Sequence, residues 1–141
     1  MNVSEFLSIS ALIVPDREAI VFGNQRITYE KLQNRVNRLA NALSDLGVKA
    51  GDRIAAMQVN CNEHIETYLA AAKLDAIFVP INFRARSEEL SFMLNDSGSK
   101  VLIFGHRYQE MVGEIKEELK SVEHFIVLEN PQEGFLFFDT I

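Results

Sequence analysis

The side chains best suited to chemistry gather between positions 61 and 66, where Cys61, Glu63, His64 and Glu66 are near neighbours. Thiolate, imidazole and carboxylate groups are the usual ligands of zinc. Glu63 and Glu66 are three residues apart and would share one face of a helix. No second histidine or cysteine completes a ligand set, so we expect a solvated helix start and no metal site.

Phosphate-binding and nucleophile motifs are also absent from the sequence. It contains neither Gly-x-Gly-x-x-Gly nor Gly-x4-Gly-Lys-Ser/Thr. The nearest approach is 98–100 (GSK), which lacks the upstream glycine and predicts a turn that leads into a strand. His106 and His124 are isolated, and no serine lies in a Gly-x-Ser-x-Gly elbow. The residues alone therefore predict no catalytic constellation.

Composition narrows the class of protein. The 141 residues carry a formal net charge of -6, the opposite sign to that of most nucleic-acid or membrane-surface binders. No apolar run approaches the roughly 20 residues of a membrane span. Cys61 is the single cysteine, which excludes an internal disulfide framework and favours a cytoplasmic protein.

The first half of the chain predicts a helix over 6–14, a hairpin and a long helix. Runs 19–22 and 26–29 flank Gly23-Asn24, a pair that tolerates the positive φ of a tight turn. Thr28 is the expected N-cap of the long helix, and Gly47 its left-handed end. One face of that helix is apolar at spacings of three and four, at Leu32, Val36, Leu39, Leu43 and Leu46.

The second half alternates apolar strands with helices. The strands are expected at 53–59, 76–80, 100–104 and 124–128. The helices are expected at 63–74 with an apolar face at Ile65, Leu69 and Ala72, at 87–97 with Ser87 as N-cap, and from Tyr108 to Leu119. Continuous apolar strands are typical of parallel sheets covered by helices. We therefore expect an α/β, three-layer αβα fold with a mainly parallel, doubly wound sheet, in which the apolar run 135–138 has no partner element.

Three segments carry a family resemblance. Residues 27–32 (ITYEKL) resemble the motif Leu-Thr-Tyr-x-Glu-Leu, and 69–84 (LAAAKLDAIFVPINFR) resemble a Lys-x-Gly-Ala-x-x-Val-Pro motif. Residues 94–103 (LNDSGSKVLI) follow in register. Together they are similar to the N-terminal part of the AMP-forming adenylating enzymes over about 15–130. Asp75 stands where the family usually has glycine, and aspartate tolerates the left-handed conformation reasonably well.

The resemblance implies that residues 1–141 are an incomplete first segment of the large N-terminal domain of an acyl-CoA synthetase. Relatives of this type join a carboxylate to ATP with Mg²⁺, forming an acyl-adenylate and releasing pyrophosphate, and the thiol of coenzyme A then displaces AMP. The phosphate-binding loop, the acyl pocket and the catalytic lysine are expected in the remainder of the parent enzyme. The 141-residue chain alone is therefore expected to be inactive, with no catalytic residue and no metal site.

Arg84 is the one candidate for cofactor binding. It follows the end of a predicted strand, where open α/β sheets bind ligands. In some acyl-CoA synthetases an arginine at the matching Asn-x-Arg position lies near the nucleotide phosphate of coenzyme A. The competing interpretation is a surface arginine paired with Glu88 or Glu89.

Two other functions stay open. A free-standing relative of the family could serve as an interaction or dimerisation module, since a shared domain that lacks its neighbours exposes apolar surface. An unrelated flavodoxin-like α/β domain would share the fold class without the function. The acyl substrate and the oligomeric state are not set by these residues.

Overall fold

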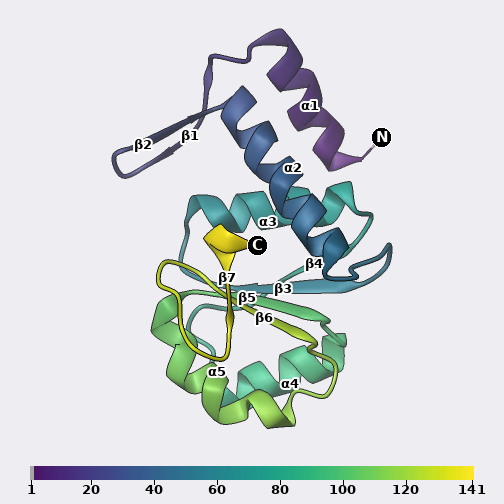
Figure 1. Ribbon diagram of the computed structural model, residues 1–141, viewed down its shortest axis with the longest axis vertical. Helices are drawn as coiled ribbons and strands as arrows, with labels where there is room; N and C mark the ends of the chain where they lie inside the picture. Colours follow the sequence, from purple (N-terminus) through teal and green to yellow (C-terminus); the bar gives the residue numbers. More distant parts are fainter. Residues whose placement is uncertain (1) are drawn as a thin grey trace. The chain divides into compact units, whose positions relative to one another are not determined.

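The computed structural model describes residues 2–141 (Figure 1). These residues form two compact units. Unit 1 holds residues 2–50 and 60–76, and unit 2 holds 51–59 and 77–141. Within 2–141, no helix is both long and apolar enough to cross a membrane. The expected α/β class, with an N-terminal helix, a hairpin and a parallel sheet, is confirmed.

The predicted hairpin is present in unit 1. Strands β1 (Glu18–Phe22) and β2 (Gln25–Thr28) are antiparallel, and Phe22 lies opposite Gln25. Gly23 and Asn24 therefore form the two-residue loop. Gly23 adopts a φ of +54°, a conformation that favours glycine at the first position of such turns.

Helix α2 (Tyr29–Asp45) follows the hairpin directly and begins as the sequence predicts. The Thr28 hydroxyl accepts a hydrogen bond of 3.3 Å from the Lys31 amide. Gly47 ends the helix at a φ of +84°, and the Val48 amide donates back to the Leu43 carbonyl over 3.0 Å. The buried face of α2 consists of Leu32, Val36, Leu39, Ala40 and Leu43.

Helices α1 (Val3–Ile13) and α3 (Asn62–Lys73) pack against α2 and against each other. The predicted apolar face of α3 is partly wrong, because Ile65 is 43% exposed. The buried residues of α3 are Asn62, Glu66, Thr67, Leu69, Ala70 and Ala71. Three of them are polar, so apolar spacing could not locate this face.

The turn after α3 confirms what was expected of Asp75. This residue adopts a φ of +53°, in the left-handed region. The Ala76 amide donates to the Ala71 carbonyl over 2.9 Å and closes the helix end. Aspartate therefore takes the conformation that glycine would adopt more easily.

Unit 2 is built on a five-stranded parallel sheet in the order β4-β3-β5-β6-β7. The strands are β3 (Arg53–Met57), β4 (Ile77–Pro80), β5 (Val101–Phe104), β6 (His124–Val127) and β7 (Leu136–Phe137). The chain places β4 on one side of β3 and β5 on the other. The strand order therefore reverses direction at β3, which gives the doubly wound sheet that the alternating pattern predicted.

One face of the sheet carries α4 (Ser87–Ser97) and α5 (Gln109–Ile115) (Figure 1). Their buried side chains meet alternate residues of β3, β5 and β6 in one apolar core. That core includes Leu90 and Leu94 from α4, Val112 and Ile115 from α5, and Met57, Phe104 and Val127 from the strands. Side chains at alternate strand positions therefore hold both helices.

Three details differ from the sequence prediction. Ser87 is the first residue of α4, and the N-cap is Arg86, whose amide donates to Glu89 Oε2 over 2.9 Å. The helix expected from Tyr108 to Leu119 is divided into the 3-10 turn η1 (His106–Tyr108), α5 and a second 3-10 turn, η2 (Lys116–Glu118). The run 135–138 does have a partner, because β7 within it pairs with β6 before the turn η3 (Phe138–Thr140).

Strand β7 has only two residues, too few for a periodic signal. It is held by packing: the Phe135 ring meets the Phe104 ring edge-on, with centroids 5.2 Å apart. Lys116 Nζ lies 5.1 Å from the Phe135 ring centroid and donates to the Gly134 carbonyl over 2.9 Å. Contacts distant in sequence therefore determine this strand.

Candidate functional site: the carboxyl edge of the sheet

The carboxyl ends of the strands of unit 2 meet at one edge, because all five strands are parallel. Ligands of open α/β sheets bind at this edge. The residues that follow the strands there are Gln58 after β3, Arg84 after β4, His106 after β5 and Glu129 after β6. Of these, only Arg84 is predicted from the sequence as a binding residue.

Local turns shape the loop that carries Arg84. The side-chain oxygen of Asn82 accepts a 3.0 Å hydrogen bond from the Arg84 amide, and the Asn82 carbonyl accepts one of 2.9 Å from Ala85. Asparagine favours such turns because its side chain bonds the backbone two residues on. Arg84 is exposed, and its guanidinium lies 5.3 Å from the centroid of the Phe83 ring.

The ion pair expected as an alternative for Arg84 is not formed. Within residues 2–141, no carboxylate lies within 4.0 Å of the Arg84 guanidinium. Glu89 instead accepts the Arg86 amide at the start of α4. The Arg84 guanidinium, which has no ion-pair partner among residues 2–141, is available to an anionic ligand.

An open, mostly apolar groove of about 470 Å³ adjoins this loop. It is lined by Asn82, Ala85, Glu88, Glu89, Phe92 and Met93. The Phe92 ring is 69% exposed and supplies a flat apolar surface. A flat ring of a ligand could pack there beside Arg84. A negatively charged group of the ligand would be repelled by Glu88 and Glu89.

The crevice between the ends of β3 and β5 is filled by the protein itself. The Gln58 side chain is 6% exposed and lies so close to Gly105 that an added Cβ would collide with its amide group. Gln58 Nε2 donates to Glu129 Oε1 over 2.9 Å, and Gln58 Oε1 accepts the Val59 amide over 2.8 Å. This is the point at which the strand order reverses and where doubly wound folds commonly bind ligands.

Glu129 joins the ends of three strands. Its second carboxylate oxygen accepts the His106 amide over 2.9 Å, while the first accepts from Gln58. Glu129 is exposed and has a φ of +74°, a left-handed conformation that costs a non-glycine residue roughly 1–2 kcal/mol. The two hydrogen bonds offset that strain.

Tyr108 connects the end of β5 to the Arg84 loop. Its ring lies in the apolar core at 9% exposure, and its hydroxyl donates to the Phe83 carbonyl over 2.9 Å. Burial raises the pKa of the Tyr108 hydroxyl; Glu129 adds to this shift and Arg107 opposes it. The hydroxyl therefore keeps its proton, and its ability to donate, at neutral pH.

The cluster considered first in the sequence has a structural role. Glu66 is 1% exposed and pairs with Arg35 Nε of α2 over 2.7 Å, while Asn62 Nδ2 donates to it over 3.0 Å. The expected solvated helix start is therefore wrong at Glu66. Among residues 2–141, no three His, Cys, Asp or Glu side chains are placed to hold a metal ion.

Burial changes the pKa of two other members of this cluster, Cys61 and His64. Burial raises the pKa of the Cys61 thiol to about 12, which leaves almost no thiolate at neutral pH. Burial also lowers the pKa of His64 and favours the neutral imidazole. The Cys61 thiol is therefore not poised as a nucleophile.

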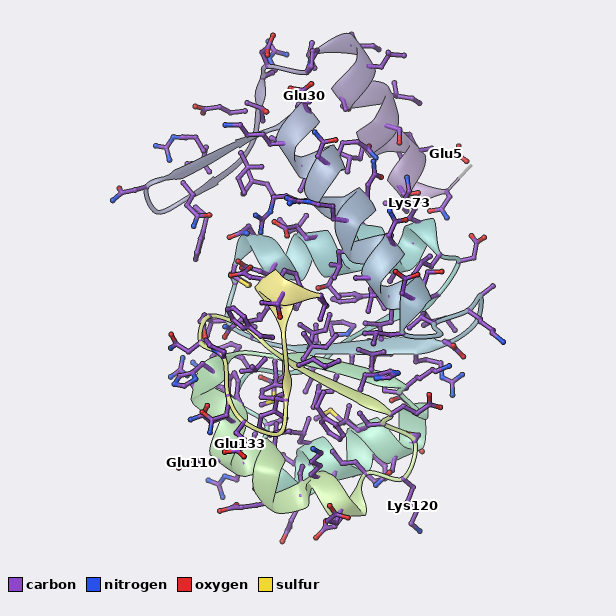
Figure 2. All side chains as sticks on the ribbon, viewed as in Figure 1. Glu5, Glu30, Lys73, Glu110, Lys120 and Glu133 are labelled. Carbon is purple, nitrogen blue, oxygen red and sulfur yellow. The ribbon has the colours of Figure 1, made fainter. Side chains whose placement is uncertain are left out.

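The 98–100 segment is a turn, as predicted. Gly98 ends α4 at a φ of +60°, Ser99 is fully buried, and Lys100 pairs with Asp52 Oδ2 at 3.3 Å. Glu110, Lys120 and Glu133 of unit 2, labelled in Figure 2, are exposed.

Sequence reasoning missed Gln58, Tyr108 and Glu129 as parts of this edge. Gln58 and Glu129 each stand one or two residues beyond an apolar strand, a position that marks the carboxyl edge. The sequence predicts Tyr108 on an apolar helix face; it lies in the 3-10 turn η1, with its ring in the apolar core. Its hydroxyl bond to a carbonyl 25 residues away leaves no local signal.

Comparison with known proteins agrees with the motifs. Residues 9–137 match the family model of the AMP-binding enzyme. The chain is 33% identical over 144 residues to a long-chain-fatty-acid–CoA ligase of Thermus thermophilus, with 99% of this chain and 27% of the relative covered. It is 41% identical over 106 residues to the long-chain-fatty-acid–CoA ligase FadD13 of Mycobacterium tuberculosis, with 74% and 21% covered.

Solved structures share the fold. An anthranilate CoA ligase, AuaEII, has a TM-score of 0.94 at 28% identity, with 99% of this chain and 27% of that chain covered. The N-terminal domain of FACL13 from Mycobacterium tuberculosis has a TM-score of 0.86 at 35% identity, with 89% and 33% covered. The chain thus spans between a fifth and a third of the proteins it matches here. With the family model matched over most of its length, the chain belongs to the AMP-binding enzyme family.

Proposed function

We propose that this chain is the N-terminal segment of the large N-terminal domain of an AMP-forming acyl-CoA synthetase. The observation that carries the proposal is the family match over residues 9–137, with relatives named as long-chain-fatty-acid–CoA ligases. The reaction joins a carboxylic acid to ATP with loss of pyrophosphate and then transfers the acyl group to the thiol of coenzyme A. A role in fatty acid metabolism and a cytoplasmic location accompany this proposal.

The chain contributes only part of such an enzyme. Among residues 2–141 there is no cluster of three metal-ligating side chains, and the sequence has no glycine-rich phosphate loop. We assign the binding of Mg²⁺, of the ATP phosphates and of the carboxylic acid substrate to the remainder of the parent enzyme. The isolated chain is expected to be inactive.

Arg84 is the residue we propose for cofactor binding, through the nucleotide phosphate of coenzyme A. Support comes from its place at the carboxyl edge, its exposure and the lack of an ion pair with residues 2–141. The apolar groove beside it, with the exposed Phe92 ring, suits the flat adenine base. Glu88 and Glu89 would keep the phosphate on the Arg84 side.

The test replaces the matching N-terminal segment of the Thermus ligase with this chain. We expect the hybrid to form acyl-CoA and the isolated chain to show no carboxylate-dependent ATP–pyrophosphate exchange. Arg84→Ala in the hybrid should raise the KM for coenzyme A about tenfold, because a charged contact to phosphate is lost. Exchange of pyrophosphate, which needs no coenzyme A, should not change.

Arg86→Ala is the matched control, since Arg86 is also exposed and lies two residues away. An unchanged KM for coenzyme A in the Arg84 variant would remove that residue from the site. Pyrophosphate exchange by the isolated chain would overturn the expected inactivity.

A second candidate function is self-association as an interaction module. Helix α1 exposes an apolar stripe at Phe6 (59%), Ile9 (48%) and Ile13 (71%), residues three and four apart that share one face. Such faces promote association in water. Light scattering of the isolated chain tests this second function. A stable homo-oligomer that dissociates in the Phe6→Ser variant favours the interaction module, and a monomer counts against it.

The unrelated flavodoxin-like alternative gains no support from the site. A flavodoxin-like domain binds its ligand where the strand order reverses. In this chain that crevice is filled by Gln58, held against Gly105 by Glu129.

A further inference from the structure

The loop that carries Arg84 has two hydrogen bonds to distant elements. The Ile81 amide donates to the Ala56 carbonyl of β3 over 2.9 Å where the loop begins, and the second bond lies at Phe83, next to Arg84. Its other bonds are local: Arg84 and Ala85 both donate to Asn82. Two-residue turns of this kind fix the shape of a loop but not its place on the sheet. The Tyr108 hydroxyl, 25 residues further along the chain, donates to the Phe83 carbonyl over 2.9 Å.

Tyr108 is itself held from two sides. Its ring is part of the apolar core beneath the sheet, with 9% of the residue exposed. The turn η1 that carries it begins at His106, whose amide is fixed by Glu129 Oε2, and the Tyr108 amide donates to the Gly105 carbonyl over 2.9 Å. The hydroxyl is thus a rigid donor, prepared before any ligand arrives.

The bonded carbonyl belongs to the residue directly before Arg84. The Phe83 ring also supports the Arg84 guanidinium at 5.3 Å from its centroid. A donor that fixes Phe83 therefore fixes both the backbone from which Arg84 extends and the ring on which its charge rests. Binding is stronger when such a group is ordered in advance.

We propose that Tyr108 is a positioning residue for Arg84, and that Glu129 fixes the turn from which Tyr108 acts. Tyr108 touches no ligand in this arrangement. It holds the Phe83–Arg84 backbone against the carboxyl edge so that the guanidinium is placed to receive the nucleotide phosphate. The inference rests on the proposed role of Arg84 and adds to it a connection between the ends of β4, β5 and β6.

The test uses the 141-residue chain with Tyr108→Phe, which keeps the buried ring and removes only the hydroxyl. Tyr29→Phe is the matched control, because Tyr29 lies in unit 1 at the start of α2. The first readout is amide hydrogen exchange at Arg84 and Ala85. Loss of one hydrogen bond should speed their exchange about fivefold relative to the control and leave the β5 amides unchanged.

The second readout is affinity for adenosine 3′,5′-bisphosphate, with adenosine as the phosphate-free probe, followed by NMR titration. Arg84→Ala should weaken the bisphosphate about tenfold and Tyr108→Phe about threefold, with adenosine unaffected. The double variant should bind no more weakly than Arg84→Ala, because Tyr108 acts through Arg84. Glu129→Ala should also speed amide exchange and weaken bisphosphate binding, but by less than Tyr108→Phe does.

The outcomes separate the two proposals. Unchanged exchange in Tyr108→Phe overturns the positioning role, whatever happens to affinity. Faster exchange with unchanged bisphosphate affinity also overturns it, since a merely structural bond would give that result. No bisphosphate binding by the chain, or binding indifferent to Arg84→Ala, overturns the assigned role of Arg84 and the positioning inference that rests on it, while exchange still reports whether Tyr108 holds the loop.

Discussion

Two glutamates, one in each unit, accept two hydrogen bonds apiece in very different settings. Glu66 lies within α3 of unit 1, is 1% exposed and is paired with Arg35 and Asn62. Glu129 lies after a strand in unit 2, is exposed and is held in a left-handed conformation by Gln58 and His106. The buried Glu66 joins two helices and contributes to stability. The exposed Glu129 instead fixes the loops at the carboxyl edge of the sheet.

The sharpest test of this contrast is Glu66→Ala. It leaves the Arg35 guanidinium and the Asn62 amide without their buried acceptor, and breaking a buried pair costs about 3 kcal/mol. The low end of the usual range applies, because the Arg35 side chain is 33% exposed and can reach water. Urea denaturation of the variant measures the loss in free energy of unfolding.

Glu63→Ala is the control on the same helix. Glu63 lies in the first turn of α3, where a negative charge favours the helix dipole by less than about 1 kcal/mol. Equal losses for the two variants would mean that the pairing of Glu66 with Arg35 adds nothing to what the half-buried Glu63 contributes on the same helix.

A smaller effect is expected in unit 2 from Gly105→Ala. The new methyl group collides with the Gln58 amide, which cannot move away freely because Glu129 and the Val59 amide hold it. Overpacking of this kind costs about 2 kcal/mol. Gly113→Ala, in α5 with open space around its Cα, should instead stabilise by about 0.5–1 kcal/mol.

The destabilisation caused by Gly105→Ala should disappear when the Gln58 side chain is removed. In the Gln58→Ala background, Gly105→Ala is expected to lose little further stability in the same urea denaturation, because the colliding amide is gone. A full loss in that background would mean that the backbone around Gly105, and not the fixed Gln58 side chain, sets the limit.

The sequence predicted elements whose signals are local. The hairpin at Gly23-Asn24, the Thr28 cap and the Gly47 end of α2 all depend on residues within one turn of each other. The apolar strands were placed because their burial on a parallel sheet needs uninterrupted runs. Arg84 is selected as a candidate by its position after a strand together with the family resemblance at 82–84, and its role stays a proposal.

What the sequence could not show are polar contacts across long separations. Glu66 was expected to be solvated because its partner Arg35 lies 31 residues away. The same holds for Gln58 and Glu129, which are 71 residues apart, and for Tyr108 and Phe83. A carboxylate or amide has the same local pattern whether it is solvated or paired, so only the folded arrangement distinguishes the two.

The smallest expected effects concern the pH dependence of the free energy of unfolding. Unit 1 is expected to lose stability as the pH falls, and unit 2 as the pH rises. In unit 1, burial lowers the pKa of His64, so the unfolded chain binds a proton first as the pH falls. The stability that neutral His64 contributes is present above about pH 6.5 and is lost as the pH falls through its folded pKa. In unit 2, burial raises the pKa of Tyr108, so its contribution is complete below about pH 10 and is lost as the pH rises through its folded pKa.

Free energies of unfolding measured across this range test both directions. His64→Gln should flatten the slope just below pH 6.5 and leave the alkaline slope unchanged. Tyr108→Phe should flatten the slope above pH 10, measured in a Cys61→Ser background because burial also raises the pKa of that thiol to about 12. If Tyr108→Phe left the alkaline slope intact in that background, the hydroxyl would titrate alike in the folded and unfolded chains, and burial could not be what keeps it a donor to Phe83.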